Sequence, residues 1–334
     1  MGGYTPLMHR HAGAVLFALV CCLGGTGCTS VEDDSDQPSG PVWDLERAEI
    51  LTWSANDSRF NQDHAVEASG LTDSGRYLYA TSEKYWRILQ IHHDEEISVR
   101  VIGLDVPGRT ELEGIGFADG TLFLCDEAHA AVYRVELPDE GGLAAVEPDD
   151  RLPVEVLQLE GPDIQAGKIG VEGVAVTADG DRLWLLLERH GNPDTGCVSR
   201  IFPLRVGPAE LVQVGEPIEI ALEDCNWRLT GLDLWRGELL ALKTQYPGER
   251  YEIISIDPAT GRWRLVLEMT DLLRGVREEG WNNNVEGLAV TEDGVLWMVS
   301  DNAWTQIIDD PTPVVADEGT LLIRIPPVVP GGGK

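Results

Sequence analysis

Residues 172–188 read EGVAVTADGDRLWLLLE, and this pattern decides the fold. It opens with an acid and a glycine, runs through a short apolar segment to a turn that contains glycine, and continues as a second apolar segment that ends at an acid. Such a turn between two apolar segments is typical of a β-hairpin. The pattern recurs along the chain at spacings of 44, 59, 58 and 56 residues. The five openings are Ser69-Gly70-Leu71, Glu113-Gly114-Ile115, Glu172-Gly173-Val174, Thr230-Gly231-Leu232 and Glu286-Gly287-Leu288.

Each repeat then supplies further β-like segments, so that a complete repeat has four strands. The fifth repeat has only Thr320–Ile325 after its hairpin, and Arg47–Trp53 is a spare strand before the first repeat. We therefore predict an all-β fold over residues 42–328, a five-bladed β-propeller with four strands per blade that the N-terminal strand closes. Length alone would allow six or seven blades. A β-sandwich or jelly roll is the alternative fold, but neither needs the same dipeptide at each strand start. Only Asp271–Glu279 predicts a short helix.

The N-terminal segment has the features of an export signal. Polar and weakly basic residues precede an apolar run, Ala14–Leu23, which is followed by small residues up to Cys28. The run is too short to span a bilayer, so it predicts the apolar part of a signal peptide. Because the segment ends at a cysteine, we expect a bacterial lipoprotein that loses residues 1–27 and carries lipid on Cys28. Ordinary secretion without lipid is the alternative.

The segments outside the predicted propeller are polar, and the strongly acidic net charge of the chain excludes some classes of binding partner. Residues 28–41 are acidic and have no hydrophobic pattern, which predicts a flexible tether, and residues 329–334 predict a disordered tail. The chain has 57 Asp and Glu against 25 Lys and Arg, a formal net charge of −32. Nucleic acids and anionic lipid surfaces need a basic protein surface, so we expect no nucleic acid and membrane contact through the lipid only.

The aligned repeats predict two rings of carboxylates at one mouth of the central channel. The first strand of a propeller blade lines the axis and the second strand runs back beside it. The residue that opens strand one and the residue that closes strand two should therefore meet at the same mouth. The first ring comprises Ser69, Glu113, Glu172, Thr230 and Glu286, and the second comprises Glu83, Glu127, Glu188, Thr244 and Asp301.

Two hypotheses account for these rings. Converging carboxylate oxygens are the ligands that Ca²⁺ prefers, and no Cys or His set competes for a softer metal. The alternative is structural, with each carboxylate accepting hydrogen bonds from backbone amides of the neighbouring blade. Seven of the ten ring positions are acidic, and blade four is neutral in both rings.

Side chains just beyond the second ring predict the wall of a pocket. They are Tyr85, His129, His190, Tyr246 and Ala303, the last beside Trp304. Of these, His129 and His190 are the candidate catalytic bases. Three cations precede first-ring positions and could pair with the acids or with an anionic ligand, namely Arg109, Lys168 and Arg228.

Three cysteines remain after Cys28. Export permits disulfides, and Cys197 and Cys225 lie in loops that share one face of adjacent predicted blades, so we expect them to form a disulfide. Two free thiols are the alternative. In either case Cys125 should be buried in its apolar strand.

The phrases LEGIGFADGTLFLCDE (112–127) and VEGLAVTEDGVLWMVSDN (285–302) resemble the propeller family called SdiA-regulated. They are also similar to the phytase-like or esterase-like propeller family, over about residues 66–326. The first resemblance implies an envelope propeller with calcium at the channel mouth and no established reaction. The calcium ligands that it implies are Glu113, Glu172, Glu286, Glu127, Glu188 and Asp301. The second implies a hydrolase of phosphate or carboxylic esters. Blades one and four depart from the pattern, with Ser69 and Thr230 in place of an acid.

Three functions remain open from the sequence. The first is a lipid-anchored binding propeller of the cell envelope, at the outer membrane or cell surface, which holds calcium and binds a small polar ligand or an envelope protein. The second is a metal-dependent hydrolase in which His129 or His190 activates water. The third is a structural envelope protein. We expect a monomer in each case.

Overall fold

The computed structural model describes residues 43–53, 66–83, 86–93, 97–106, 108–139, 150–160, 164, 170–246, 249–279, 281, 284–301 and 320–328. The predicted signal peptide, tether and tail lie outside these residues. So do four residues singled out in the sequence, Tyr85, Lys168, Ala303 and Trp304, and the predicted lipid attachment site Cys28.

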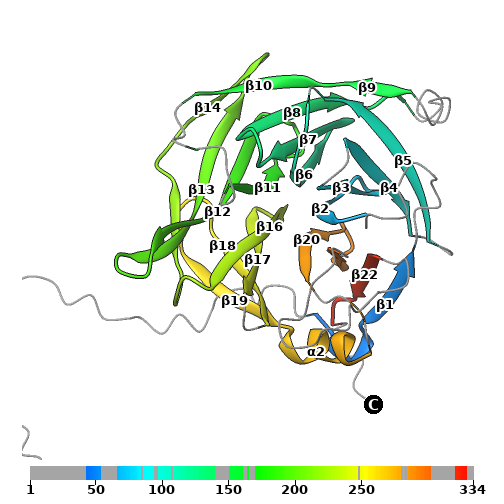
Figure 1. Ribbon diagram of the computed structural model, residues 1–334, viewed down its shortest axis with the longest axis vertical. Coiled ribbons are helices and arrows are strands. Elements are labelled where there is room, and N and C mark those ends of the chain that lie inside the picture. The colour runs from blue at the N-terminus through cyan, green and yellow to red at the C-terminus, as the bar shows by residue number, and fades with distance from the viewer. Residues whose placement is uncertain are drawn as a thin grey trace, which may run out of the picture. The chain divides into compact units, whose positions relative to one another are not determined.

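The described chain is a β-propeller, as predicted. Its innermost strands surround a central axis and the later strands of each set lie progressively farther out (Figure 1). The inner strands neighbour one another in a closed ring, in chain order and back to the first. They are β2 (Ala68–Asp73), β6 (Leu112–Ala118), β11 (Val171–Val176), β16 (Trp227–Trp235) and β20 (Val285–Val290).

Behind each inner strand the chain folds back as an antiparallel meander. Behind β2 and β6 follow β3 (Leu78–Ser82), β4 (Arg87–His92), β5 (Ser98–Asp105), β7 (Thr121–Asp126), β8 (Ala131–Glu136) and β10 (Glu155–Glu160). Behind β11 and β16 follow β12 (Arg182–Asn192), β13 (Gly196–Val206), β15 (Ile218–Ala221), β17 (Glu238–Gln245), β18 (Arg250–Ile256) and β19 (Trp263–Glu268).

The two ends of the described chain share the last set of strands. Behind β20 lie β21 (Leu296–Ser300) and β22 (Thr320–Ile325), and β1 (Glu49–Trp53) pairs antiparallel with β22 from Glu49↔Arg324 to Trp53↔Thr320. Trp43 adds an isolated bridge to Pro327. The predicted closure by an N-terminal strand is confirmed.

The recurring glycine of the pattern lies where neighbouring inner strands come closest. A Cβ atom on Gly70 would lie 2.4 Å from the carbonyl oxygen of Glu113, and one on Gly287 would lie 2.1 Å from that of Ser69. No real Cβ tolerates such a distance, so only glycine allows the ring of strands to close this tightly.

Two short strands were not predicted. β9 (Arg151–Pro153) pairs parallel with β5, and β14 (Glu210–Gln213) pairs parallel with β10 as well as antiparallel with β13. Each covers the outer edge of the preceding set of strands (Figure 1), which satisfies backbone groups that an edge strand would otherwise expose. Because of the β10–β14 pairing, two of the sets form one continuous sheet, and the prediction of separate four-stranded blades needs this correction.

The core lies between the faces of adjacent sets of strands. One apolar cluster, for example, brings Trp184 and Leu186 of β12 against Leu232 of β16. Inner strands such as β11 are buried on both faces, which explains their continuous apolar sequence.

The predicted short helix is confirmed as α2 (Thr270–Glu278), and a 3₁₀ turn, η1 (Leu45–Arg47), precedes β1. Leu273 and Val276 anchor α2 in the apolar cluster that includes Tyr251. Across the ranges described above, no helix is both long and apolar enough to cross a lipid bilayer.

Candidate functional site

A β-bulge at the start of each inner strand sets the direction of the first-ring side chains. The pairing between strands one and two shifts register at the ring position in all five cases, for example between Val285 and Gly287 around Glu286. A bulge inserts one unpaired residue and re-aims its side chain. All first-ring side chains are buried, and they are Ser69, Glu113, Glu172, Thr230 and Glu286.

The second ring lies at the same mouth. In four of the five sets the second-ring residue donates its backbone amide to a residue just before the first-ring position, as Glu188 does to Gly170 and Asp301 to Asn284. In the remaining set the second-ring residue Thr244 pairs with Arg228 between β16 and β17. Of the second ring, Glu127, Glu188, Thr244 and Asp301 are buried. The structure thus brings the two predicted rings to one end of the channel.

Arg228 is the cation of this mouth. Its guanidinium lies 3.3 Å from Glu188 and 3.2 Å from Glu286 and donates to Thr244 at 3.3 Å. Its side chain is 21% exposed, so this ion-paired cluster opens to solvent. Of the three cations proposed from the sequence, Arg228 pairs with ring carboxylates, whereas Arg109 is 81% exposed and pairs with Glu111.

Two first-ring carboxylates accept hydrogen bonds from side chains. Ser69 donates from its hydroxyl to Glu113 at 2.6 Å, and Asn284 donates to Glu286 at 2.9 Å. The first bond links two ring side chains and the second links a ring carboxylate to a neighbouring amide side chain, which differs from the alternative of purely backbone partners for the carboxylates.

Burial and mutual repulsion shift the pKa values of the charged side chains at this mouth. Burial, together with repulsion by Glu113 and Glu188, raises the pKa of Glu172 well above its ordinary value. Burial also raises the pKa of Glu286, although Arg228 and Asn284 act in the opposite direction. For Arg228 burial lowers the pKa, but attraction by the carboxylates outweighs it and the net shift is upward.

The donor set does not fit a calcium ion bound between Glu188 and Glu286. Ca²⁺ takes six to eight oxygen ligands, and here the Arg228 guanidinium already pairs with both carboxylates. No three His, Cys, Asp or Glu residues of the described ranges lie close enough to hold a metal ion. Calcium therefore stays a prediction from the sequence.

A histidine and a buried aspartate form a second group at the mouth, in the turn after β7. His129 Nδ1 lies 2.7 Å from Asp126 Oδ2, and Tyr133 donates its hydroxyl to the same oxygen at 2.7 Å. The other oxygen, Oδ1, accepts the backbone amides of Glu111 and Ala128, each at 3.0 Å. The aspartate is fully buried and the His129 side chain is 47% exposed.

Asp126 was missed by the sequence reasoning, which placed Glu127 in the ring and passed over its neighbour. The sequence signal that could have identified Asp126 is its position three residues before the candidate base His129. His190 is exposed and Tyr246 is 56% exposed, so these two side chains do not enclose a pocket.

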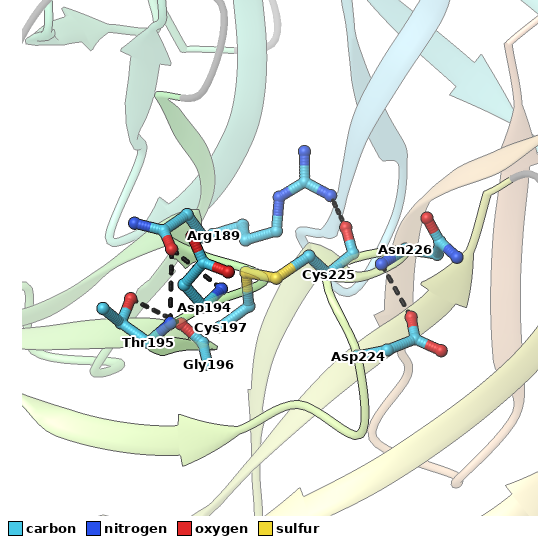
Figure 2. The surroundings of a disulfide bond; sticks show 9 residues. Arg189, Asp194, Thr195, Gly196, Cys197, Asp224, Cys225 and Asn226 are labelled. Atoms are coloured by element: carbon cyan, nitrogen blue, oxygen red, sulfur yellow. Dashed lines mark hydrogen bonds between the residues drawn. A yellow bond between two sulfur atoms is a disulfide. The ribbon is translucent and has the colours of Figure 1, made fainter.

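The structure joins Cys197 and Cys225 by a disulfide (Figure 2). Arg189 of β12, which follows the second-ring residue Glu188, donates to the backbone oxygen of Cys225 beside the disulfide. Leu222 and Trp227 pack against the bridge, which ties the β12–β13 hairpin to the segment that enters β16. Cys125 is free and buried, and burial raises the pKa of its thiol well above the ordinary value.

A comparison with protein-family models gives a family. A sequence model described as "Phytase-like: Esterase-like activity of phytase" matches residues 53–304. A comparison with curated protein sequences gives no match.

Solved structures match at low identity. The glutaminyl cyclase of Myxococcus xanthus is 15% identical, with 84% of this chain and 97% of that chain covered and a TM-score of 0.49. The virginiamycin B lyase of Staphylococcus aureus is 10% identical, with 84% and 100% covered and a TM-score of 0.38.

Proposed function

This chain belongs to the phytase-like family, and we propose that it hydrolyses carboxylic or phosphate esters at the channel mouth with His129 as the general base. The observation that carries the proposal is the hydrogen bond between His129 Nδ1 and the buried Asp126. The esterase-like activity in the family's description supports the class of reaction.

The environment of Asp126 determines which ring nitrogen is available. Its carboxylate accepts the Nδ1 proton, so the lone pair of His129 is on Nε2, and the half-exposed ring can present it to solvent. The two backbone amides and the Tyr133 hydroxyl fix the carboxylate in place. A base held in one tautomer by a buried carboxylate is the arrangement that general-base hydrolysis needs.

The reaction follows from this geometry. Nε2 takes a proton from water as the water oxygen bonds to the ester carbon or phosphorus. Asp126 stabilises the imidazolium that forms, and Nε2 then returns the proton to the departing alkoxide oxygen as the ester bond breaks. Positioned acid–base catalysis of this kind contributes about 10²- to 10⁴-fold in rate.

Arg109 supplies a group for an anionic substrate. It is two residues before Glu111, whose backbone amide binds Asp126, and its exposed guanidinium pairs with Glu111 at 3.3 Å. A guanidinium can bind a phosphate or carboxylate through two parallel hydrogen bonds.

The test compares p-nitrophenyl acetate and p-nitrophenyl phosphate hydrolysis by the parent, His129→Ala and Asp126→Asn. We expect both variants to lose about 10²-fold or more in kcat/KM on the substrate that the parent accepts. His190→Ala is the matched control, because this exposed histidine, in β12, occupies the corresponding position of the next repeat, and it should keep the parental rate. Parental activity in His129→Ala, or no hydrolysis of either ester by the parent, would overturn the proposal.

The lipid anchor at Cys28 and the place in the cell envelope form part of the same proposal, supported by the signal segment in the sequence. The resemblance to the SdiA-regulated family adds an expectation of calcium, which the hydrolysis described here does not require.

A further inference from the structure

The first-ring residues around Arg228 are not used by the proposed hydrolysis. We propose that Glu172 and Thr230 bind the primary ammonium group of a small ligand at the axis, beside Arg228. This inference is independent of the reaction at His129.

The first observation is the hydroxyl of Thr230. This residue is 1% exposed, and its Oγ1 has no hydrogen-bond partner among the described residues. It occupies the same bulge position as Glu172 and Glu286, on the inner strand between theirs, so its side chain is aimed at the same cluster. The other hydroxyl of the ring, on Ser69, is satisfied by Glu113. Because buried polar groups are normally paired, the Thr230 hydroxyl indicates a ligand group.

The second observation is the side chain of Glu172. It is 7% exposed and forms no hydrogen bond or ion pair with any residue that the structure describes. Glu113, Glu188 and Glu286 act on it by repulsion, and Arg228 is the cation that attracts it. That guanidinium is hydrogen-bonded to Glu188 and Glu286 instead. Among the groups that act most strongly on Glu172, three carboxylates oppose one cation, and a second cation beside Glu172 would relieve the repulsion.

The chemistry of the cluster selects the cation. A divalent metal would need a convergent set of carboxylates, which the described residues do not provide. An anion would be repelled by the excess of carboxylates. A primary ammonium is a compact charge with three donors, so it can give one to Glu172 and one to the Thr230 hydroxyl. A quaternary ammonium carries charge without a donor and would leave that hydroxyl unpaired.

Methylammonium chloride is the probe, measured by thermal shift and calorimetric titration against tetramethylammonium chloride, calcium chloride and sodium chloride at equal ionic strength. We expect saturable binding and a rise in Tm with methylammonium only, because a ligand that binds the folded state stabilises it. No saturable response, or an equal response to tetramethylammonium, would overturn the proposal. A stronger response to calcium would also overturn it, in favour of the metal predicted from the sequence.

Two variants locate the site. Glu172→Gln removes the charge and keeps the shape, and Thr230→Val removes the hydroxyl with little change in shape, so each should weaken methylammonium binding by about tenfold or more. If Glu172→Gln does not fold, Thr230→Val decides. Glu155→Gln is the matched control, because Glu155 is a partly exposed acid on the outer strand β10 paired with Arg134, and it should bind like the parent.

Parental affinity in both site variants contradicts the assignment. His129→Ala should bind methylammonium normally, which separates a failure of this inference from a failure of the proposed hydrolysis.

Discussion

Removal of the Cys197–Cys225 disulfide should cost the protein a measurable part of its stability. The perturbation is the double variant Cys197→Ser, Cys225→Ser. The bridge closes a loop with a sequence separation of 28 residues. In the chain-entropy model a loop of that length restricts the unfolded chain by about 12 cal/mol/K, which is about 3.6 kcal/mol at 25 °C.

The native contacts around the disulfide indicate which segment of the chain should lose stability first when the disulfide is removed. Leu222 and Trp227 pack on the cysteines, and the Arg189 guanidinium donates to the backbone oxygen of Cys225. Without the bridge, the segment before β16 is held by these contacts alone. We therefore expect amide exchange to increase in this segment before it does in the inner strands, since local openings need less energy than global unfolding.

Chemical denaturation of the parent and the double variant, each with and without reductant, measures the free energy of unfolding. The reduced parent should match the variant, and the variant should not respond to reductant. Alkylation of the unfolded parent without reductant should modify Cys125 and spare the bridged pair. A difference below about 1 kcal/mol would refute the entropic argument, and alkylation of all three thiols would refute the disulfide itself.

Three further predictions concern the titration, the ring of strands and the anchor. Burial raises the pKa of Asp233 to about 6 from 3.8, so its stabilising contribution is complete below pH 3.8 and is lost as pH rises through 6. The loss is about 3 kcal/mol at most, and Asp233→Asn should flatten this part of a plot of unfolding free energy against pH; an unchanged slope contradicts the assignment. Gly287→Ala should destabilise by about 3 kcal/mol or more, because its Cβ would meet the Ser69 carbonyl, whereas Gly275→Ala in α2, with open space around it, should stabilise by up to about 1 kcal/mol. Equal melting temperatures for these two glycine variants would disprove the steric argument. Cys28→Ala should move the protein from the membrane pellet to the soluble fraction of lysed cells, and continued sedimentation with membranes would exclude lipid as the anchor.

The strands could be predicted because their signals are local. Each recurring phrase contains an apolar inner strand, a turn and the strand that pairs with it. The extra β-like segment before the first repeat supplies the strand that the fifth repeat lacks. The short strands β9 and β14 could not be predicted in this way. Each has only three or four residues, and each pairs with a strand from a different repeat, so its partner is not visible in the local pattern.

The site was predictable in position but not in its contacts. The repeat alignment placed the ring residues at one mouth, and it offered Arg109, Lys168 and Arg228 equally as counter-ions. Arg228 pairs with Glu188 and Glu286, which lie 40 and 58 residues away along the chain. Asp126 could not be singled out in the sequence, because an acid beside another acid has no distinguishing local signal, although in the structure Asp126 accepts four hydrogen bonds.

The sequence by itself determined the β-propeller class, the closing strand and the positions of the two rings, because repetition and alternating polarity act over a few residues. The tertiary structure decided why each opening dipeptide has a glycine, since the close approach at Gly70 involves the backbone of the next repeat. It also decided that Arg228 bridges two carboxylates while Glu172 and Thr230 are left without hydrogen-bond partners among the described residues. Charge pairing and desolvation depend on distances across the ring, and those distances exist only once the inner strands have closed around the axis.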